Sequence, residues 1–137
     1  NLGGGVDLPF GRVKLTLAFH SSKLPDGSNG GNPGGYIVEV PGGYTFCHVG
    51  DTDVFSDMRL LGELYDLDLV FVPIGDNYTM GPRGAAHACK LLAAETIVPI
   101  HWGTFPILTG TPDEFARELA EQGVPGELKV LQPGDVY

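Results

Sequence analysis

In the first third of the chain, hydrophobic and polar residues alternate with the two-residue period of β-strands. Apolar residues recur at strand spacing over residues 13–19, 35–40 and 44–49, and a Pro-Gly-Gly turn signal separates the last two segments. These two segments are therefore predicted to form an antiparallel hairpin. Residues 21–35 are rich in Ser, Gly, Pro and Asn, which predicts a long loop, and loops of this kind are often functional.

After residue 50 the pattern changes to helices that alternate with buried strands. Apolar residues recur at helical spacing from Phe55 to Leu64, with Thr52 or Asp53 as the candidate cap. The remaining apolar segments predict strands over 67–74 and 95–100, helices over 82–94 and 112–122, and a final strand over 128–131.

The helix over residues 112–122 has the clearest end signals. Thr111 fits its N-cap, Pro112 its first position and Glu114 its third, and Gly123 fits its C-terminal end. Thr79 is a candidate cap upstream of the preceding helix. Strands followed by alternating strands and helices predict a layered fold of the α/β (α+β) class.

Composition and charge narrow the classes of partner. The chain has 137 residues, of which 42% are apolar, so one domain with a real core is expected. The formal net charge of −9 makes nucleic acid an unlikely partner, because an acidic surface repels phosphate. No segment approaches the roughly 20 apolar residues of a membrane span, and no signal peptide is visible. Cys47 and Cys89 have no disulfide or zinc-knuckle spacing, which favours buried thiols and a cytoplasmic location.

Three residues with metal-binding side chains directly follow apolar strands. His20 follows the segment 13–19, Asp51 follows 44–49 and His101 follows 95–100. Residues beyond the carboxyl ends of strands line the ligand crevice in α/β folds, and imidazole with carboxylate suits zinc, manganese or iron. Each residue also has a plainer interpretation: a histidine that makes a structural hydrogen bond, or a Gly-Asp-Thr turn that caps a helix.

The order of several motifs resembles one family along nearly the whole chain. The stretches AFHSS, GGNPGGYIVEV, YTFCHVGDTDVFSDM, VPIGDNYTMGP and VPIHWGTFP are similar to the metallo-β-lactamase superfamily, in particular to its metal-dependent hydrolases with H-x-G-D-T and P-I-G-D-x-x-T-M-G-P motifs. The resemblance implies an αββα sandwich with metals at one edge, between its two sheets. It implies that His20 completes a first metal site, that Asp51 bridges two metals, and that His101 completes a second site.

The family's H-x-H-x-D-H signature is absent from these residues. Residues 1–137 are therefore expected to be the C-terminal half of the sandwich, with an N-terminal half of about 90 residues as a separate partner chain. The start at Asn1 rather than Met agrees with this. A separate gene product, a cleavage product and a truncated sequence all remain open as its origin.

The function that the resemblance implies is metal-dependent hydrolysis. A metal-bound hydroxide would attack a small ester, lactone, amide or phosphodiester, and the chain would be active only with its N-terminal half. Two divalent ions are expected, with zinc favoured over manganese or iron, and Asp51 would orient the nucleophile as the catalytic residue. The alternatives are a phosphodiesterase or nuclease, and a non-catalytic metal-binding subunit. A higher oligomer is a further possibility.

Five residues are expected to surround the metals or to line the substrate pocket: His48, Asp76, Tyr78, Thr79 and Trp102. Asp76 either accepts a hydrogen bond from a ligating histidine or helps to cap the next helix. Trp102 either forms an apolar wall beside the substrate or simply packs. We keep both interpretations open for each.

Overall fold

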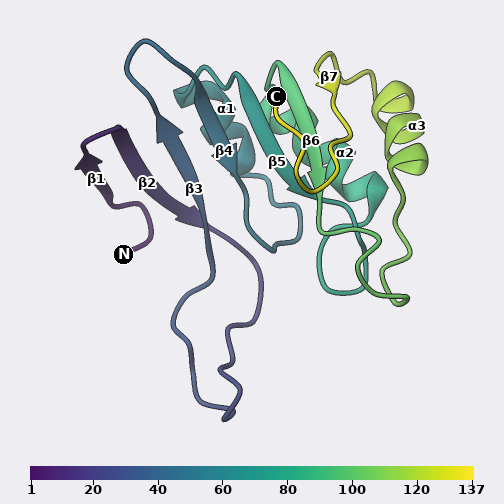
Figure 1. The fold of residues 1–137 in the computed structure, drawn as a ribbon, viewed down its shortest axis with the longest axis horizontal. Helices are drawn as coiled ribbons and strands as arrows, with labels where there is room; N and C mark the ends of the chain where they lie inside the picture. Colours follow the sequence, from purple (N-terminus) through teal and green to yellow (C-terminus); the bar gives the residue numbers. More distant parts are fainter.

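Seven strands lie side by side in one sheet in the order in which they occur in the sequence, β1 to β7 (Figure 1). The structure is a computed structural model and describes residues 1–137. Its elements are β1 (Gly5–Leu8), β2 (Gly11–Leu17), β3 (Gly34–Glu39), β4 (Thr45–His48), α1 (Met58–Leu64), β5 (Leu69–Pro73), α2 (Pro82–Leu92), β6 (Thr96–Ile100), α3 (Pro112–Gln122) and β7 (Glu127–Leu128).

The direction of the strands brings several carboxyl ends to one edge. Strands β1 to β4 pair antiparallel, whereas β4 to β7 pair parallel. It follows that β2, β4, β5 and β6 all run the same way, and the segments that follow them leave the sheet at the same edge. The predicted hairpin of residues 35–40 and 44–49 is confirmed as β3 and β4.

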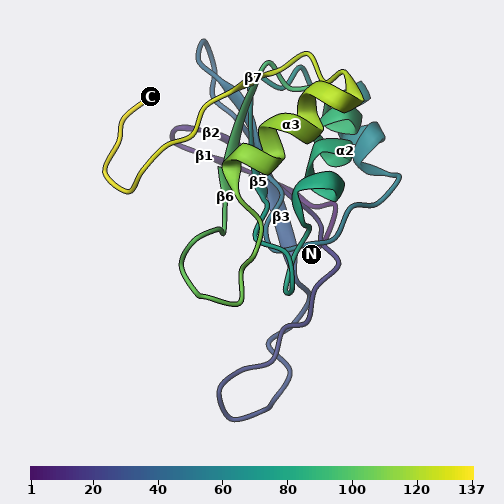
Figure 2. The ribbon, with the colours of Figure 1, turned by 90° about the vertical axis from the view of Figure 1, so that its right-hand side faces the viewer.

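All three helices cover the same face of the sheet (Figure 2). The hydrophobic core fills the space between them, and Val70, Ile97 and Phe115 are fully buried there. Helix α2 turns three alanines and Cys89 toward the core, and such small side chains allow a helix to lie close to a sheet. The result is one β layer and one α layer. None of the helices has the length and hydropathy that crossing a membrane requires.

The opposite face of the sheet has no helix over it. Because side chains alternate along a strand, the buried Cys47 in β4 leaves Phe46 and His48 on this open face. Phe46 packs edge-on against Phe71 of β5, with 6.1 Å between ring centroids. Tyr36 of β3 is 48% exposed. The open face is therefore aromatic, and the C-terminal segment runs along its side in Figure 2.

Several strand boundaries differ from the prediction. The strand over 13–19 starts earlier and ends at Leu17, so Phe19 and His20 belong to the following loop. An additional strand, β1, precedes β2 and pairs antiparallel with it. No signal for this strand is visible in the Gly-rich start of the sequence. The final strand over 128–131 is wrong in extent, because only Glu127 and Leu128 pair with β6.

Two of the three predicted helix caps need correction, although α2 begins at Pro82 as predicted. Helix α1 begins at Met58, and neither Thr52 nor Asp53 caps it: Thr52 is fully buried and bonds elsewhere, and the Asp53 carboxylate accepts from Val54. The N-cap of α2 is Gly81 rather than Thr79. The N-cap of α3 is confirmed, since Thr111 accepts from the Glu114 backbone N–H at 3.3 Å, and Gly123 ends the helix in the left-handed conformation. The Glu114 carboxylate bonds the Thr111 hydroxyl rather than its backbone N–H, so the capping box is only half formed.

Candidate metal centre

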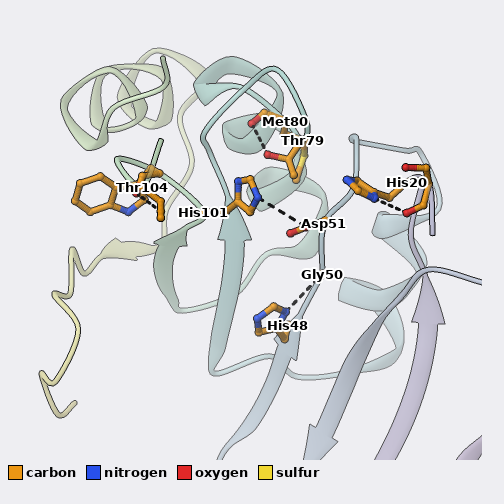
Figure 3. Close-up of polar contacts among 10 residues, drawn as sticks. His20, His48, Gly50, Asp51, Thr79, Met80, His101 and Thr104 are labelled. Atoms are coloured by element: carbon orange, nitrogen blue, oxygen red, sulfur yellow. Dashed lines mark hydrogen bonds and ion pairs between the residues drawn. The ribbon is translucent and has the colours of Figure 1, made fainter. Parts of the chain in front are cut away.

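Strand ends carry the three predicted ligands to one edge of the sheet. His20 follows β2, Asp51 follows β4 and His101 follows β6, and these strands run in the same direction. Figure 3 shows Asp51 in this view between the two imidazoles, with His101 on one side and His20 on the other. Residues more than 80 positions apart in the sequence therefore meet at this edge because of the topology alone.

Asp51 and His101 face each other directly. Asp51 Oδ2 lies 3.7 Å from His101 Nε2, and the two side chains are 46% and 27% exposed. This separation is too long for a good hydrogen bond. Two ligand atoms on a tetrahedral zinc lie about 3.4 Å apart, given metal–ligand bonds of about 2.1 Å. The pair is thus spaced like two ligands of one ion.

His20 is not part of a compact ligand cluster in this structure. Its Nδ1 lies 2.7 Å from the Ser21 carbonyl oxygen. A carbonyl can only accept, so Nδ1 carries the proton and Nε2 is left free to bind a metal. No group of three or more His, Cys, Asp or Glu side chains is arranged to hold an ion. The structure brings two of the three predicted ligands together and leaves the third nearby with the tautomer that a ligand needs.

The position of His101 is set by an unusual backbone. Its φ of 54° is left-handed, which is uncommon for a residue other than glycine. The backbone of Gly75 packs against its carbonyl oxygen so closely that a Cβ at Gly75 would overlap it. Nδ1 of His101 is buried and has no hydrogen-bond partner. Strain and an unsatisfied polar atom at one residue are features that cluster at functional sites.

His48 lies beside this site on the open face. The Gly50 backbone N–H donates to its Nδ1 at 3.1 Å, and its ring stacks on Phe71 with centroids 5.7 Å apart. Partial burial lowers the pKa of His48, and the charge of Asp51 opposes this effect. Because Nδ1 accepts, a neutral His48 carries its proton on Nε2. His48 therefore orders the turn that precedes Asp51.

The other four predicted residues make local contacts or face solvent, rather than hydrogen-bonding to Asp51 or His101. The Asp76 carboxylate accepts from the Asn77 N–H at 2.8 Å, and it bonds neither a histidine nor the start of α2. Tyr78 is 57% exposed, and the Thr79 hydroxyl lies 3.4 Å from the Met80 carbonyl.

Trp102 makes a more buried contact than these residues. It donates from its indole N–H to Pro99 at 3.1 Å and packs against the core. The packing interpretation of Trp102 is the one that these contacts favour.

One residue of the site was assigned a different role from sequence. Thr52 is 0% exposed, although it directly follows Asp51 in a polar turn. Its hydroxyl accepts from the Phe19 N–H at 2.8 Å. A threonine in a Gly-Asp-Thr turn gives no sequence signal for a contact 33 residues away, so only the fold could show it.

The chemistry of the donors fits a divalent metal. A carboxylate and an imidazole face one another at ligand spacing, and a second imidazole with a free Nε2 lies at the same edge. Neither cysteine can act as a nucleophile or ligand there, because both are buried in the core. This mixed donor set suits zinc, manganese or iron.

Comparison with known proteins identifies the family of this chain. A model of the beta-lactamase superfamily domain matches residues 1–102. The chain belongs to the metallo-β-lactamase superfamily. A UPF0173 metal-dependent hydrolase of Rubrobacter xylanophilus is 48% identical over 139 residues, which are 98% of this chain and 57% of that protein.

Solved structures show the same fold. Igni18, a metallo hydrolase from Ignicoccus hospitalis, is 37% identical with a TM-score of 0.85, over 98% of this chain and 57% of that one. A Thermotoga maritima structure described as a candidate zinc-dependent hydrolase is 26% identical with a TM-score of 0.64, over 85% and 56%. The chain thus spans a little over half the length of the relatives that it matches.

Proposed function

We propose that this chain supplies part of the active site of a metal-dependent hydrolase. The observation that carries the proposal is the pair of Asp51 and His101, which face each other at 3.7 Å at the edge where four parallel strand ends meet. When bound, a divalent metal supplies a water activated as a nucleophile near neutral pH and polarises the oxygen of the scissile group. Two ions are proposed, with zinc first and manganese or iron as the alternatives.

The residues of this chain have distinct tasks in the proposal. Asp51 and His101 hold metal directly, and Asp51 also orients the nucleophile as the catalytic carboxylate. His20 joins them through the free Nε2 that its bond to Ser21 leaves available. His48 keeps the turn before Asp51 in shape through the Gly50 N–H.

The remaining ligands are proposed to come from outside these 137 residues, on an N-terminal half that carries the H-x-H-x-D-H motif. Two observations support this. The ligands in the chain do not complete a three-residue cluster, and the open face of the sheet exposes aromatic rings such as Tyr36. A second sheet would cover these rings, because sheets with an apolar face pack against another layer. Activity would then require both halves, and a higher oligomer is compatible with this arrangement.

A small molecule is proposed as the substrate, with an ester, lactone, amide or phosphodiester as the reacting bond. The second candidate activity is a phosphodiesterase or nuclease, which the net charge of −9 disfavours for long nucleic acids. The third is a non-catalytic metal-binding subunit. We further propose a cytoplasmic location, which the two unpaired thiols support.

Metal content and hydrolysis together test the proposal. The natural protein is expected to contain bound zinc by elemental analysis, and His101→Ala and Asp51→Ala are expected to lose it. His87→Ala is the matched control, because His87 is exposed on α2 and takes no part in the site. Chromogenic lactones, esters and bis-aryl phosphates then separate the candidate activities. Equal metal content in all four proteins would refute the site, and metal without any hydrolysis would favour the non-catalytic subunit.

A further inference from the structure

We propose that Thr52 is a positioning residue that braces the His20 loop against the Asp51 turn, and so sets the spacing of the metal ligands. This inference rests on the proposed function for its consequence, but its geometry stands on contacts within the chain. Thr52 is the only residue with a fully buried hydroxyl that directly adjoins a candidate ligand.

Two hydrogen bonds join the loop after β2 to the turn after β4. The Phe19 N–H donates to the Thr52 hydroxyl oxygen at 2.8 Å, and the Asp53 N–H donates to the Phe19 carbonyl at 3.3 Å. The backbone N–H and C=O of Phe19, the residue before His20, are thus both bonded to the turn after β4. The rings of Phe19 and Phe55 add an edge-on contact at 5.1 Å between centroids. This contact reinforces the same junction.

The direction of the Thr52 hydroxyl is itself fixed. It donates to the Asp53 carbonyl at 2.7 Å, so the lone pairs of its oxygen remain available to accept from the Phe19 N–H. A hydroxyl used as donor and acceptor at once is needed here, and valine, which has the same shape, would provide neither. The loss would leave a backbone N–H without its partner.

The main chain of Thr52 extends the brace to a third loop. The Met80 N–H donates to the Thr52 carbonyl at 3.1 Å, and the Asp76 N–H donates to the Met80 carbonyl at 3.0 Å. The loops after β2, β4 and β5 therefore converge on one buried residue. His20 itself makes only a bond to its neighbour Ser21, so its placement relative to Asp51 depends on this junction.

The test compares metal binding by Thr52→Val, Thr52→Ser and Thr96→Val in the natural protein. Thr96 is the matched control, because it is also buried but lies at the start of β6, at the opposite end of that strand from His101. Cobalt(II) is the probe, since its ligand-field absorption reports the ligand geometry. Thr52→Val is expected to weaken cobalt affinity by about 10- to 100-fold and to change the spectrum, as loss of groups that orient ligands commonly does. Thr52→Ser and Thr96→Val are expected to bind as the unmodified protein does.

Hydrogen exchange of the Phe19 and Asp53 amides in the metal-free protein provides a second, independent measurement. Both amides are expected to exchange faster in Thr52→Val and at the native rate in Thr52→Ser. Native exchange and native cobalt binding in Thr52→Val would overturn the proposal, as would equal defects in Thr52→Ser. If the unmodified protein binds no cobalt, the proposed function fails, and the exchange rates alone then decide whether the brace exists.

Discussion

Gly75→Ala should displace His101 and weaken the metal site from a position that touches no metal. Gly75 is buried two residues beyond the end of β5, and a methyl group there would overlap the His101 carbonyl oxygen and lie 3.3 Å from His101 Nδ1. The neighbour is backbone and cannot rotate away, so the ends of β5 and β6 must separate. Overpacking of this kind costs about 1–3 kcal/mol. At ~4 °C per kcal/mol for a chain of this length, the melting temperature of the metal-free protein should fall by roughly 4–12 °C.

The assay for this prediction pairs thermal unfolding with zinc affinity. Gly84→Ala is the control, because Gly84 lies within α2 and an added Cβ would meet nothing closer than 3.7 Å. Alanine favours a helix, so this variant should be more stable by about 0.5–1 kcal/mol and bind zinc normally. Gly75→Ala should bind zinc at least about tenfold more weakly. A Gly75→Ala protein with native stability and native affinity would refute the argument that the Gly75 backbone sets the position of His101.

Three other consequences follow from the structure. Burial raises the pKa of Cys47 to about 12 and that of Cys89 further still, so neither thiol should react with a disulfide reagent at pH 8 until the protein is unfolded, and rapid labelling of folded protein would contradict this. Burial lowers the pKa of His48 below its ordinary value of 6.5, so its contribution to stability is complete above that pH and is lost as the pH falls through the folded pKa. His48→Asn keeps an acceptor for Gly50, and urea unfolding should show a smaller loss of stability for it than for the unmodified protein between about pH 7.5 and pH 5. Thr111→Ala should cost about 1 kcal/mol by removing the cap of α3, and an unchanged unfolding midpoint would show that the cap contributes nothing.

The sequence predicted the elements whose signals are local. A few neighbouring positions are enough to predict the cap residue Thr111, the final Gly123 and the apolar strand over 95–100, and all three are present. Strand β1 was missed because it is four residues long, begins with a glycine and is exposed throughout, and it exists by pairing with β2. Register and neighbours of this kind depend on the whole sheet.

For the candidate site too, the sequence predicted the local features but not the contacts between distant segments. That His20, Asp51 and His101 follow strands was readable, and the strand directions then place them at one edge. The sequence could not show that Asp51 and His101 face each other while His20 bonds to Ser21, because the loops between them decide the orientation of each side chain. Contacts between distant segments, such as that of Thr52 with Phe19, have no periodicity to reveal them.

The site's central claim is that Asp51 and His101 bind the same divalent metal. Diffraction from zinc-loaded crystals of the natural protein, recorded on both sides of the zinc absorption edge, tests it directly. The account predicts an anomalous peak within bonding distance of both Asp51 Oδ2 and His101 Nε2. Zinc-loaded crystals in which these two atoms remain in place and no anomalous peak lies between them would contradict it.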